Sequence, residues 1–146
     1  MPRSLSPKTI LDEHERRELA EVLQAAARRT SAAVKVVILR HGWGDIRSKA
    51  IQTFRAMGMD RAEARNGVLI LVATADREYA IYGDRGIHRL VGQEFWDNVR
   101  DVMARSFEES EMGRGLCDAV TLAAGMLEQH FPDAAGGKVE APDAVA

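Results

Sequence analysis

The chain has 146 residues, a formal net charge of −2 and a hydrophobic content of 46%. This length is typical of one domain with one hydrophobic core. The single cysteine, Cys117, excludes an intramolecular disulfide bond, and the lack of a basic block argues against a nucleic-acid partner.

The two ends of the chain are expected to lie outside the domain. Residues Met1–Lys8 are polar and are not followed by the apolar segment of a secretion signal. The longest strongly apolar run, Val68–Ala73, is too short to span a bilayer, so we expect a cytoplasmic protein without a membrane span. The expected organisation is an N-terminal extension at 1–9, a domain at 10–132 and a flexible tail at 133–146.

The first half of the domain is predicted to form a helix, a strand and a second helix. An amphipathic pattern predicts a helix over 10–29, with Ser6 as its expected cap. The β-branched run Ala33–Leu39 is typical of a strand that is covered on both faces. Asp45 can cap the second helix, which is predicted over Ile46–Met57.

The second half is predicted to form two strands and then only helices. The strands are Val68–Ala73 and Glu78–Tyr82, and the short connection between them predicts antiparallel pairing. Helices are expected near Ile87–Val91, at Gln93–Phe107 and at Leu116–Gln129. This order predicts an α/β fold, a three-layer αβα sandwich around a small mixed sheet of about four strands.

Several short motifs follow one another in the second half of the domain. They include Asn66–Ala73, Asp76–Arg77, the Gly83–Ile87 loop and the Phe-Trp-Asp sequence at Phe95–Asp97. In this order they resemble the TPM domain family, in particular its stand-alone soluble bacterial members. The resemblance implies an αβα fold with a mixed sheet and divalent-metal sites. For plastid members it also implies an acid phosphatase activity.

Two positions depart from the pattern of that family. Similar stand-alone members carry glutamates where this chain has Ala33 and Leu39. Divalent cations such as Ca²⁺ and Mg²⁺ need several oxygen ligands, mostly carboxylates. The resemblance implies a Ca or Mg cofactor, and the two replacements predict weaker binding than in members that keep the carboxylates.

Asp84 is the best candidate ligand in the sequence. It stands in a Gly-Asp-Arg-Gly loop, and Glu94 and Asp97 lie about one helical turn apart in the helix that follows. In the functional interpretation, Asp84 holds a cation together with Asp97 or Glu94. In the structural interpretation, Asp84 caps the short helix after the loop and forms an ion pair with Arg85 or Arg89.

The same loop also allows an enzyme hypothesis, that of a weak metal-dependent acid phosphatase. Arg85, Arg89 and His88 would then bind the phosphate group. The sequence offers no nucleophile with a matching base, so no catalytic residue is assigned. The favoured function is a non-catalytic binding or regulatory module that binds a divalent cation at the Gly83–Gly86 loop or an unidentified protein partner, and the oligomeric state stays open.

Overall fold

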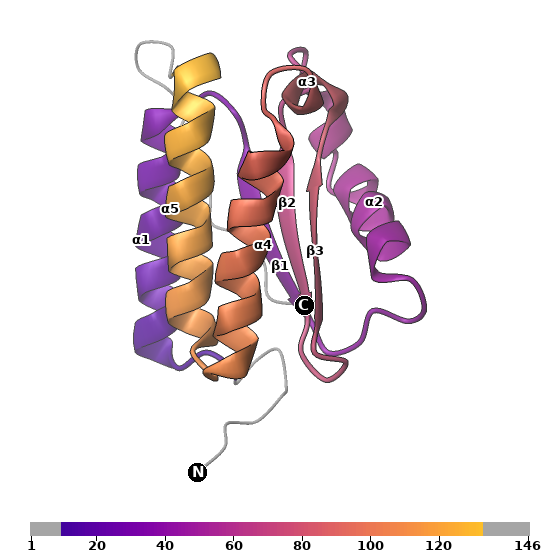
Figure 1. Cartoon of the computed structure of the whole chain (residues 1–146), viewed down its shortest axis with the longest axis vertical. Coiled ribbons are helices and arrows are strands. Elements are labelled where there is room, and N and C mark those ends of the chain that lie inside the picture. Colours follow the sequence, from indigo (N-terminus) through magenta and orange to yellow (C-terminus); the bar gives the residue numbers. More distant parts are fainter. Residues whose placement is uncertain (1–9, 133–146) are drawn as a thin grey trace.

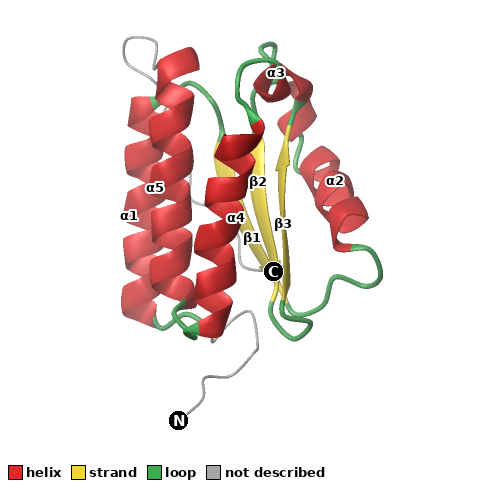
Figure 2. Cartoon of the chain, viewed as in Figure 1, coloured by secondary structure: helices red, strands yellow, loops and turns green. Residues whose placement is uncertain are grey.

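The computed structural model describes residues 10–132 as a β-sheet between two layers of helices (Figure 1). The elements in chain order are α1 (Glu13–Arg29), β1 (Val34–Leu39), α2 (Ile46–Ala56), the 3₁₀ helix η1 (Met59–Arg61), β2 (Val68–Ala73), β3 (Glu78–Gly83), α3 (Arg85–His88), α4 (Gln93–Glu108) and α5 (Met112–His130). Helix α2 covers one face of the sheet, and α1, α4 and α5 cover the other (Figure 2). The predicted αβα sandwich is therefore confirmed. No helix in this part of the chain is long and apolar enough to cross a membrane.

The sheet has the strand order β1-β2-β3. Strands β1 and β2 pair in parallel, from Val34 opposite Val68 to Leu39 opposite Ala73. Strands β2 and β3 pair antiparallel, with Val68 opposite Gly83. The antiparallel pairing agrees with the sequence prediction. The central strand β2 is buried along its whole length because it has a neighbour on each side and helices over both faces.

The predicted number of about four strands is wrong, since residues 10–132 contain three. After β3 the chain continues only as helices. The nearest approach to a further strand is an isolated bridge between Thr30 and Pro132. Proline has no amide hydrogen and cannot extend a hydrogen-bonded ladder, so this bridge stays isolated.

Successive residues of β2 divide the core between the two faces of the sheet. Ile70 and Val72 join the larger cluster under α1, α4 and α5. Leu69 and Leu71 join a smaller cluster under α2, where Phe54 is also buried. Each fully buried side chain of this kind contributes roughly 1.5–3 kcal/mol. The layer formed by α2 is therefore held by far fewer apolar contacts than the three-helix layer.

The cap of α1 lies later in the chain than predicted. The Asp12 carboxylate accepts a hydrogen bond from the Glu15 amide at 2.8 Å, and the Glu15 carboxylate accepts one from the Asp12 amide at 2.9 Å. This reciprocal capping box starts α1 at Glu13, not at residue 10. The expected cap, Ser6, lies outside the described residues. The predicted cap of α2, Asp45, is confirmed.

Helix α5 begins four residues before its predicted start at Leu116. A Cβ atom at Gly115 would overlap the side chain of Ser106 on α4, and one at Gly113 would overlap Glu15 on α1. Glycine at these two positions lets α5 pack closely against α1 and α4 while it stays a regular helix. The prediction left both glycines outside the helix, whereas the structure places them inside it, where they make room for neighbouring side chains.

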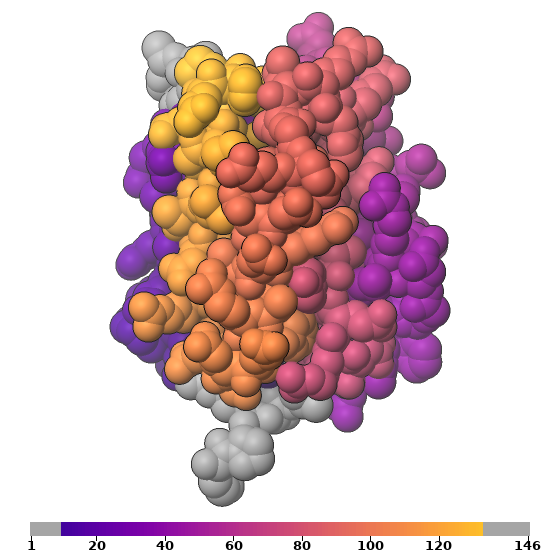
Figure 3. All heavy atoms as spheres, in the orientation of Figure 1, coloured from indigo at the N-terminus to yellow at the C-terminus, as the bar shows by residue number. Residues whose placement is uncertain are grey.

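Helices α1 and α5 run side by side in the same direction (Figure 1). Near their ends, Arg29 donates a hydrogen bond to Glu128 at 2.8 Å. Beyond both helices, the amide of Ser31 donates to the carbonyl of Phe131 at 3.0 Å. In the space-filling view, α5 and α4 lie next to each other, and α2 lies at the right-hand edge of the molecule (Figure 3). The first and last helices of the described chain thus close the same layer.

Candidate functional site

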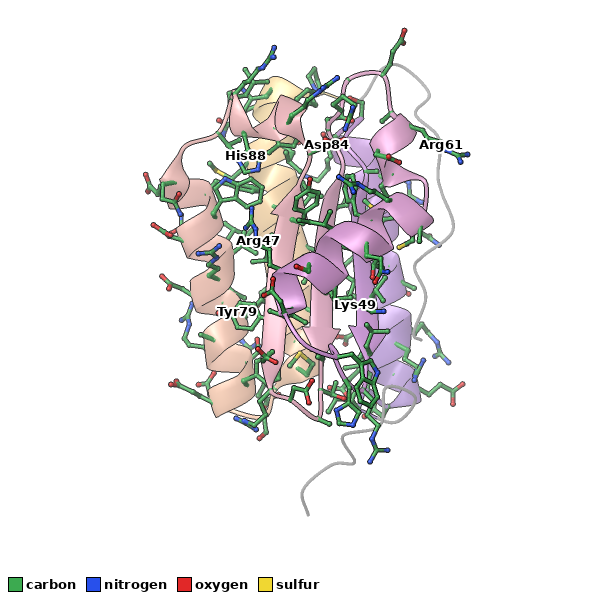
Figure 4. The ribbon with its side chains drawn as sticks, turned by 90° about the vertical axis from the view of Figure 1, so that its right-hand side faces the viewer. Arg47, Lys49, Arg61, Tyr79, Asp84 and His88 are labelled. Atoms are coloured by element: carbon green, nitrogen blue, oxygen red, sulfur yellow. The ribbon has the colours of Figure 1, made fainter. Side chains whose placement is uncertain are left out.

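Asp84 follows the end of β3 and caps α3, as the structural interpretation of the sequence predicted (Figure 4). The residue is 2% exposed. Arg65 donates from Nε to Oδ2 at 2.7 Å and from Nη2 to Oδ1 at 3.0 Å. The amide of Arg85 donates to Oδ1 at 2.8 Å. Both carboxylate oxygens therefore accept hydrogen bonds from the chain itself.

The ion pair between Asp84 and Arg65 is charged at neutral pH. Burial by itself raises the pKa of Asp84, but the hydrogen bonds from Arg65 and from the Arg85 amide outweigh it, so the pKa lies below its usual value. The same contact raises the pKa of Arg65. A buried carboxylate that stays ionised in this way is poorly suited to exchange protons near pH 7.

The backbone holds Arg65 against the loop that carries Asp84. Arg65 adopts a left-handed conformation, with φ at 51°. Its carbonyl accepts a hydrogen bond from the Gly86 amide at 2.9 Å, and the Asp84 amide donates to Gly67 at 2.9 Å. A Cβ atom at Gly86 would overlap the carbonyl oxygen of Ala64. Position 86 therefore requires glycine for this close approach.

The partner of Asp84 was wrongly predicted. The sequence interpretation paired it with Arg85 or Arg89, which are close in the chain, whereas the structure pairs it with Arg65. The chain brings Arg65 to this place because it precedes the Asn66–Gly67 entry into β2, and β2 pairs with β3. A signal was present in the sequence, because an arginine directly before a strand can reach the loop that leaves the neighbouring antiparallel strand.

The two other predicted metal ligands lie in the first turns of α4. Glu94 and Asp97 are both exposed. Asp97 accepts a hydrogen bond from Gln93 at 3.0 Å within the same helix. Within residues 10–132, neither side chain forms a hydrogen bond or an ion pair with Asp84 or Arg65, so these carboxylates contribute to the surface of α4.

The residues of the alternative anion-binding interpretation lie together in and just after α3. Arg85, His88 and Arg89 are all exposed. The His88 ring stacks on Trp96, with ring centroids 5.0 Å apart and an interplanar angle of 27°. Helix α3 has only four residues, too few to add a helix dipole of useful size.

A second polar cluster, which the sequence interpretation missed, lies at the opposite end of the sheet. His41 follows β1, and Asp76 lies in the turn between β2 and β3. The Asp76 carboxylate contacts His41 Nδ1 at 2.8 Å and accepts a hydrogen bond from the Gly42 amide at 2.9 Å. These bonds lower the pKa of Asp76, that of the Gly42 amide being the larger cause. The turn residue Asp76 thus fixes the loop that leaves β1.

Trp43 stands in this loop and is 80% exposed. It has φ at 51°, and Gly44 after it has φ at 99°. A left-handed conformation is uncommon for a bulky residue and costs roughly 1–2 kcal/mol. The His41 ring lies 5.0 Å from the indole. The sequence signal was the tryptophan between two glycines, in a loop at the carboxyl end of a strand.

A surface hollow of about 370 Å³ lies between the end of α4 and the start of α5. Its charged lining residues are of both signs, with two arginines and three carboxylates. They are Arg105, Arg114, Glu109, Glu111 and Asp118. No predicted site residue takes part in this hollow.

The family model of the TPM domain matches residues 6–126 of the sequence. This chain belongs to the TPM domain family. The resemblance that the motifs indicated is therefore confirmed. No curated protein shows a significant match to the chain.

Solved structures support this assignment of the TPM domain. The BA42 protein from the psychrophilic bacterium Bizionia argentinensis is 30% identical, with a TM-score of 0.83 over 90% of this chain and 91% of that one. An N-terminal domain of a protein from P. gingivalis is 18% identical, with a TM-score of 0.69 over 84% and 79% of the two chains. The N-terminal domain of cg2496 from Corynebacterium glutamicum is 12% identical, with a TM-score of 0.65 over 85% and 78%. The last two comparisons show the fold alone.

The cation that the family resemblance implies would have to find its ligands around Asp84. Residues 10–132 contain no group of three or more His, Cys, Asp or Glu side chains that could hold a metal ion. The Asp84 carboxylate is bound by Arg65, whose guanidinium already supplies the compensating positive charge. A cation at this carboxylate would have to compete with that guanidinium.

Proposed function

We propose that this TPM domain is a non-catalytic binding module. The observation that carries the proposal is the state of Asp84, the central residue of the predicted site. Its two oxygens accept three hydrogen bonds from Arg65 and Arg85, and 2% of the residue is exposed. A nucleophile or general base needs an accessible lone pair aimed at the substrate. The Asp84 carboxylate serves instead as the link between α3 and the chain segment before β2.

The alternative is a weak metal-dependent phosphatase, and the grouping of Arg85, His88 and Arg89 favours it. Two exposed guanidinium groups next to an imidazole can bind a phosphate and stabilise its developing charge. The imidazole of His88 stacks on Trp96, however, and no accompanying nucleophile has been identified. We therefore rank this activity second.

An assay with p-nitrophenyl phosphate distinguishes the two proposals. We expect hydrolysis at the buffer rate from pH 5 to pH 8, with or without Ca²⁺ or Mg²⁺. Arg28 on α1 is an exposed arginine remote from α3 in the chain, so Arg28→Ala is the matched control for Arg85→Ala. Both variants must be folded, as judged by circular dichroism. Turnover that disappears in Arg85→Ala and persists in Arg28→Ala would then rank the phosphatase above the binding module.

Binding of a divalent cation at the Gly83–Gly86 loop stays a prediction, which calorimetry tests separately. If Ca²⁺ or Mg²⁺ binds there, Asp84→Asn should weaken binding at least tenfold, or about 1.4 kcal/mol. Arg65→Gln removes the competing guanidinium and should then strengthen binding. No heat above dilution in the wild type and in Arg65→Gln would leave Asp84 with its structural role.

A further inference from the structure

The surface of α2 differs in composition from the rest of the domain. Helix α2 carries three basic and no acidic side chains, whereas α1, α4 and α5 together carry ten acidic and seven basic ones. Arg47 and Arg55 on α2 and Arg61 on η1 are exposed. Figure 4 looks onto this layer, with Arg47 near the start of α2 and Arg61 beyond its end. The exposed carboxylate of Asp45, which caps α2, interacts electrostatically with Arg47, and within the described residues no ion pair involves Arg55 or Arg61.

Exposed apolar side chains lie at the two ends of α2. The large exposed hydrophobic residues of the described chain are Trp43, Met57 and Leu90, and none of them belongs to α1, α4 or α5. Trp43 precedes α2 by three residues and is 80% exposed, and Met57 ends α2 and is 36% exposed. We call the set Trp43, Arg47, Arg55, Met57 and Arg61 the α2 surface. Aromatic residues, Met and Arg are the types that protein interfaces concentrate.

The Trp43 end of the α2 surface is ordered before any partner arrives. The Asp76 carboxylate holds both His41 and the Gly42 amide, which fixes the backbone next to Trp43. The left-handed backbone of Trp43 is strained, and the indole remains exposed in this conformation. Strain of this kind persists where surrounding contacts enforce it, and it is concentrated at binding loops. A loop whose backbone is held in advance loses less entropy on binding.

We propose that the α2 surface binds an acidic segment of another protein, with Leu or Phe side chains between its carboxylates. The apolar side chains of the segment would pack on Trp43 and Met57, and its carboxylates would pair with Arg47, Arg55 and Arg61. This proposal rests on the proposed function as a binding module and names the class of partner. The argument for this occupant is charge complementarity, because α2 is the one helix of more than four residues in the described part of the chain that carries no acidic side chain.

A protein segment fits the α2 surface better than a nucleic acid does. Nucleic-acid affinity comes from many phosphate contacts, and the chain as a whole carries a formal net charge of −2. The two apolar ends of the surface would meet no matching groups on a phosphate backbone. On an acidic segment with spaced Leu or Phe residues, both kinds of contact are satisfied.

The probe is a synthetic 16-residue peptide of Glu, Asp, Leu and Phe without tryptophan. The chain has two tryptophans, and Trp96 is 7% exposed, so acrylamide quenching reports mainly on Trp43. We expect the peptide to protect Trp43 from acrylamide. Amide shifts in NMR spectra of the ¹⁵N-labelled chain should be confined to the loop at Trp43, to α2 and to η1. Arg55→Glu should weaken binding at least tenfold, whereas Arg28→Glu on α1 should change it less than twofold.

Two control peptides separate the charged from the apolar contacts. One has Gln in place of every acidic residue, and the other has Ser in place of Leu and Phe. Both should bind at least tenfold more weakly than the probe. Equal binding of either control, or shifts that spread over α1, α4 and α5, would overturn the proposal.

Two further outcomes would identify a different occupant of the α2 surface. Tighter binding of a 16-nucleotide single strand, with the same shifts, would make it a nucleic-acid site. Sedimentation of the chain alone as a dimer that Trp43→Ala dissociates would make the occupant a second copy. These results are independent of the phosphatase assay, so failure here leaves the non-catalytic proposal to be judged by its own experiment.

Discussion

Arg65 and Asp84 form a two-fold hydrogen-bonded ion pair, at 2.7 and 3.0 Å, between the segment before β2 and the loop after β3. The Asp84 side chain is 3% exposed, and the Arg65 side chain is 33% exposed. Breaking a buried pair costs far more than its net contribution, because the remaining charge loses its partner. The stability of this end of the sheet therefore depends on both residues together.

Asp84→Asn should lower the free energy of unfolding by about 2–3 kcal/mol at pH 7. The change removes the negative charge that pairs with Arg65 and that accepts the hydrogen bond of the Arg85 amide at the start of α3. Arg65→Gln should also destabilise, because it leaves the buried carboxylate uncompensated. Urea denaturation measures both variants. The double variant should lose less than the sum of the single losses, and strict additivity would show that the two side chains are not coupled.

The contribution of Asp84 should depend on pH. Its pKa is lower in the folded state than in the unfolded state, where it is about 3.9. The stabilisation is therefore fully present above about pH 4 and is lost as the pH falls through the folded pKa. The stability difference between the wild type and Asp84→Asn should shrink in acid-denaturation series below pH 4. A constant difference down to pH 2 would contradict the assigned pKa direction.

Gly86→Ala should destabilise the domain by about 2–3 kcal/mol, because the new methyl group would overlap backbone carbonyl oxygens that cannot move independently. Gly92 is the matched control, since a Cβ atom there meets no atom within 4 Å. Gly92 caps α4, so Gly92→Ala should cost less than about 1 kcal/mol. Thermal unfolding of the two variants side by side tests the comparison, and similar losses would refute it.

Trp43→Gly should leave the free energy of unfolding within about 1 kcal/mol of the wild type. Glycine relieves the left-handed strain, which offsets its larger loss of entropy on folding. Trp96→Ala should cost about 3–5 kcal/mol because that tryptophan is buried. A large loss in Trp43→Gly would mean that the exposed indole is needed for the fold and is not free for a partner.

Cys117 should react slowly with iodoacetamide in the folded domain. Burial raises the pKa of its thiol from 9.0 to about 11, and the nearby charges of Glu18 and Asp118 act in the same direction. Only the thiolate reacts, so at pH 8 labelling should be about 100-fold slower than in the unfolded chain. Mass spectrometry with and without urea measures the ratio. Equal rates would show that α5 opens readily around this residue.

The fold was largely predictable because its main signals are local. The β-branched run before Leu39 and the apolar run Val68–Ala73 identified two strands, and the short turn at Asp76 required β3 to pair antiparallel. Asp45 located the start of α2 correctly. The start of α5 was misjudged because the reason for Gly113 and Gly115 lies on other helices, at Glu15 and Ser106. Steric requirements between distant segments leave no local pattern.

The site was less predictable for the same physical reason. The capping role of Asp84, one of the two interpretations of the sequence, is confirmed. Its ionic partner, Arg65, becomes a neighbour only when β2 and β3 pair. The contact of His41 with Asp76 likewise joins residues that only the parallel alignment of β1 and β2 brings together. The basic α2 surface escaped notice because its residues are spaced along a helix and form no continuous basic run.

The side-by-side arrangement of α1 and α5 has a consequence for synthesis on the ribosome. The sheet and α2 can assemble once β3 has emerged, but the other face of the sheet is closed only when α5 follows. Until then Ile70, Val72 and their neighbours lack the cover of α5, and α1 lacks its helical partner. Contacts between such distant segments slow folding, and exposed apolar surface invites aggregation. The nascent chain should therefore be a client of holding chaperones in the interval between the completion of β3 and that of α5.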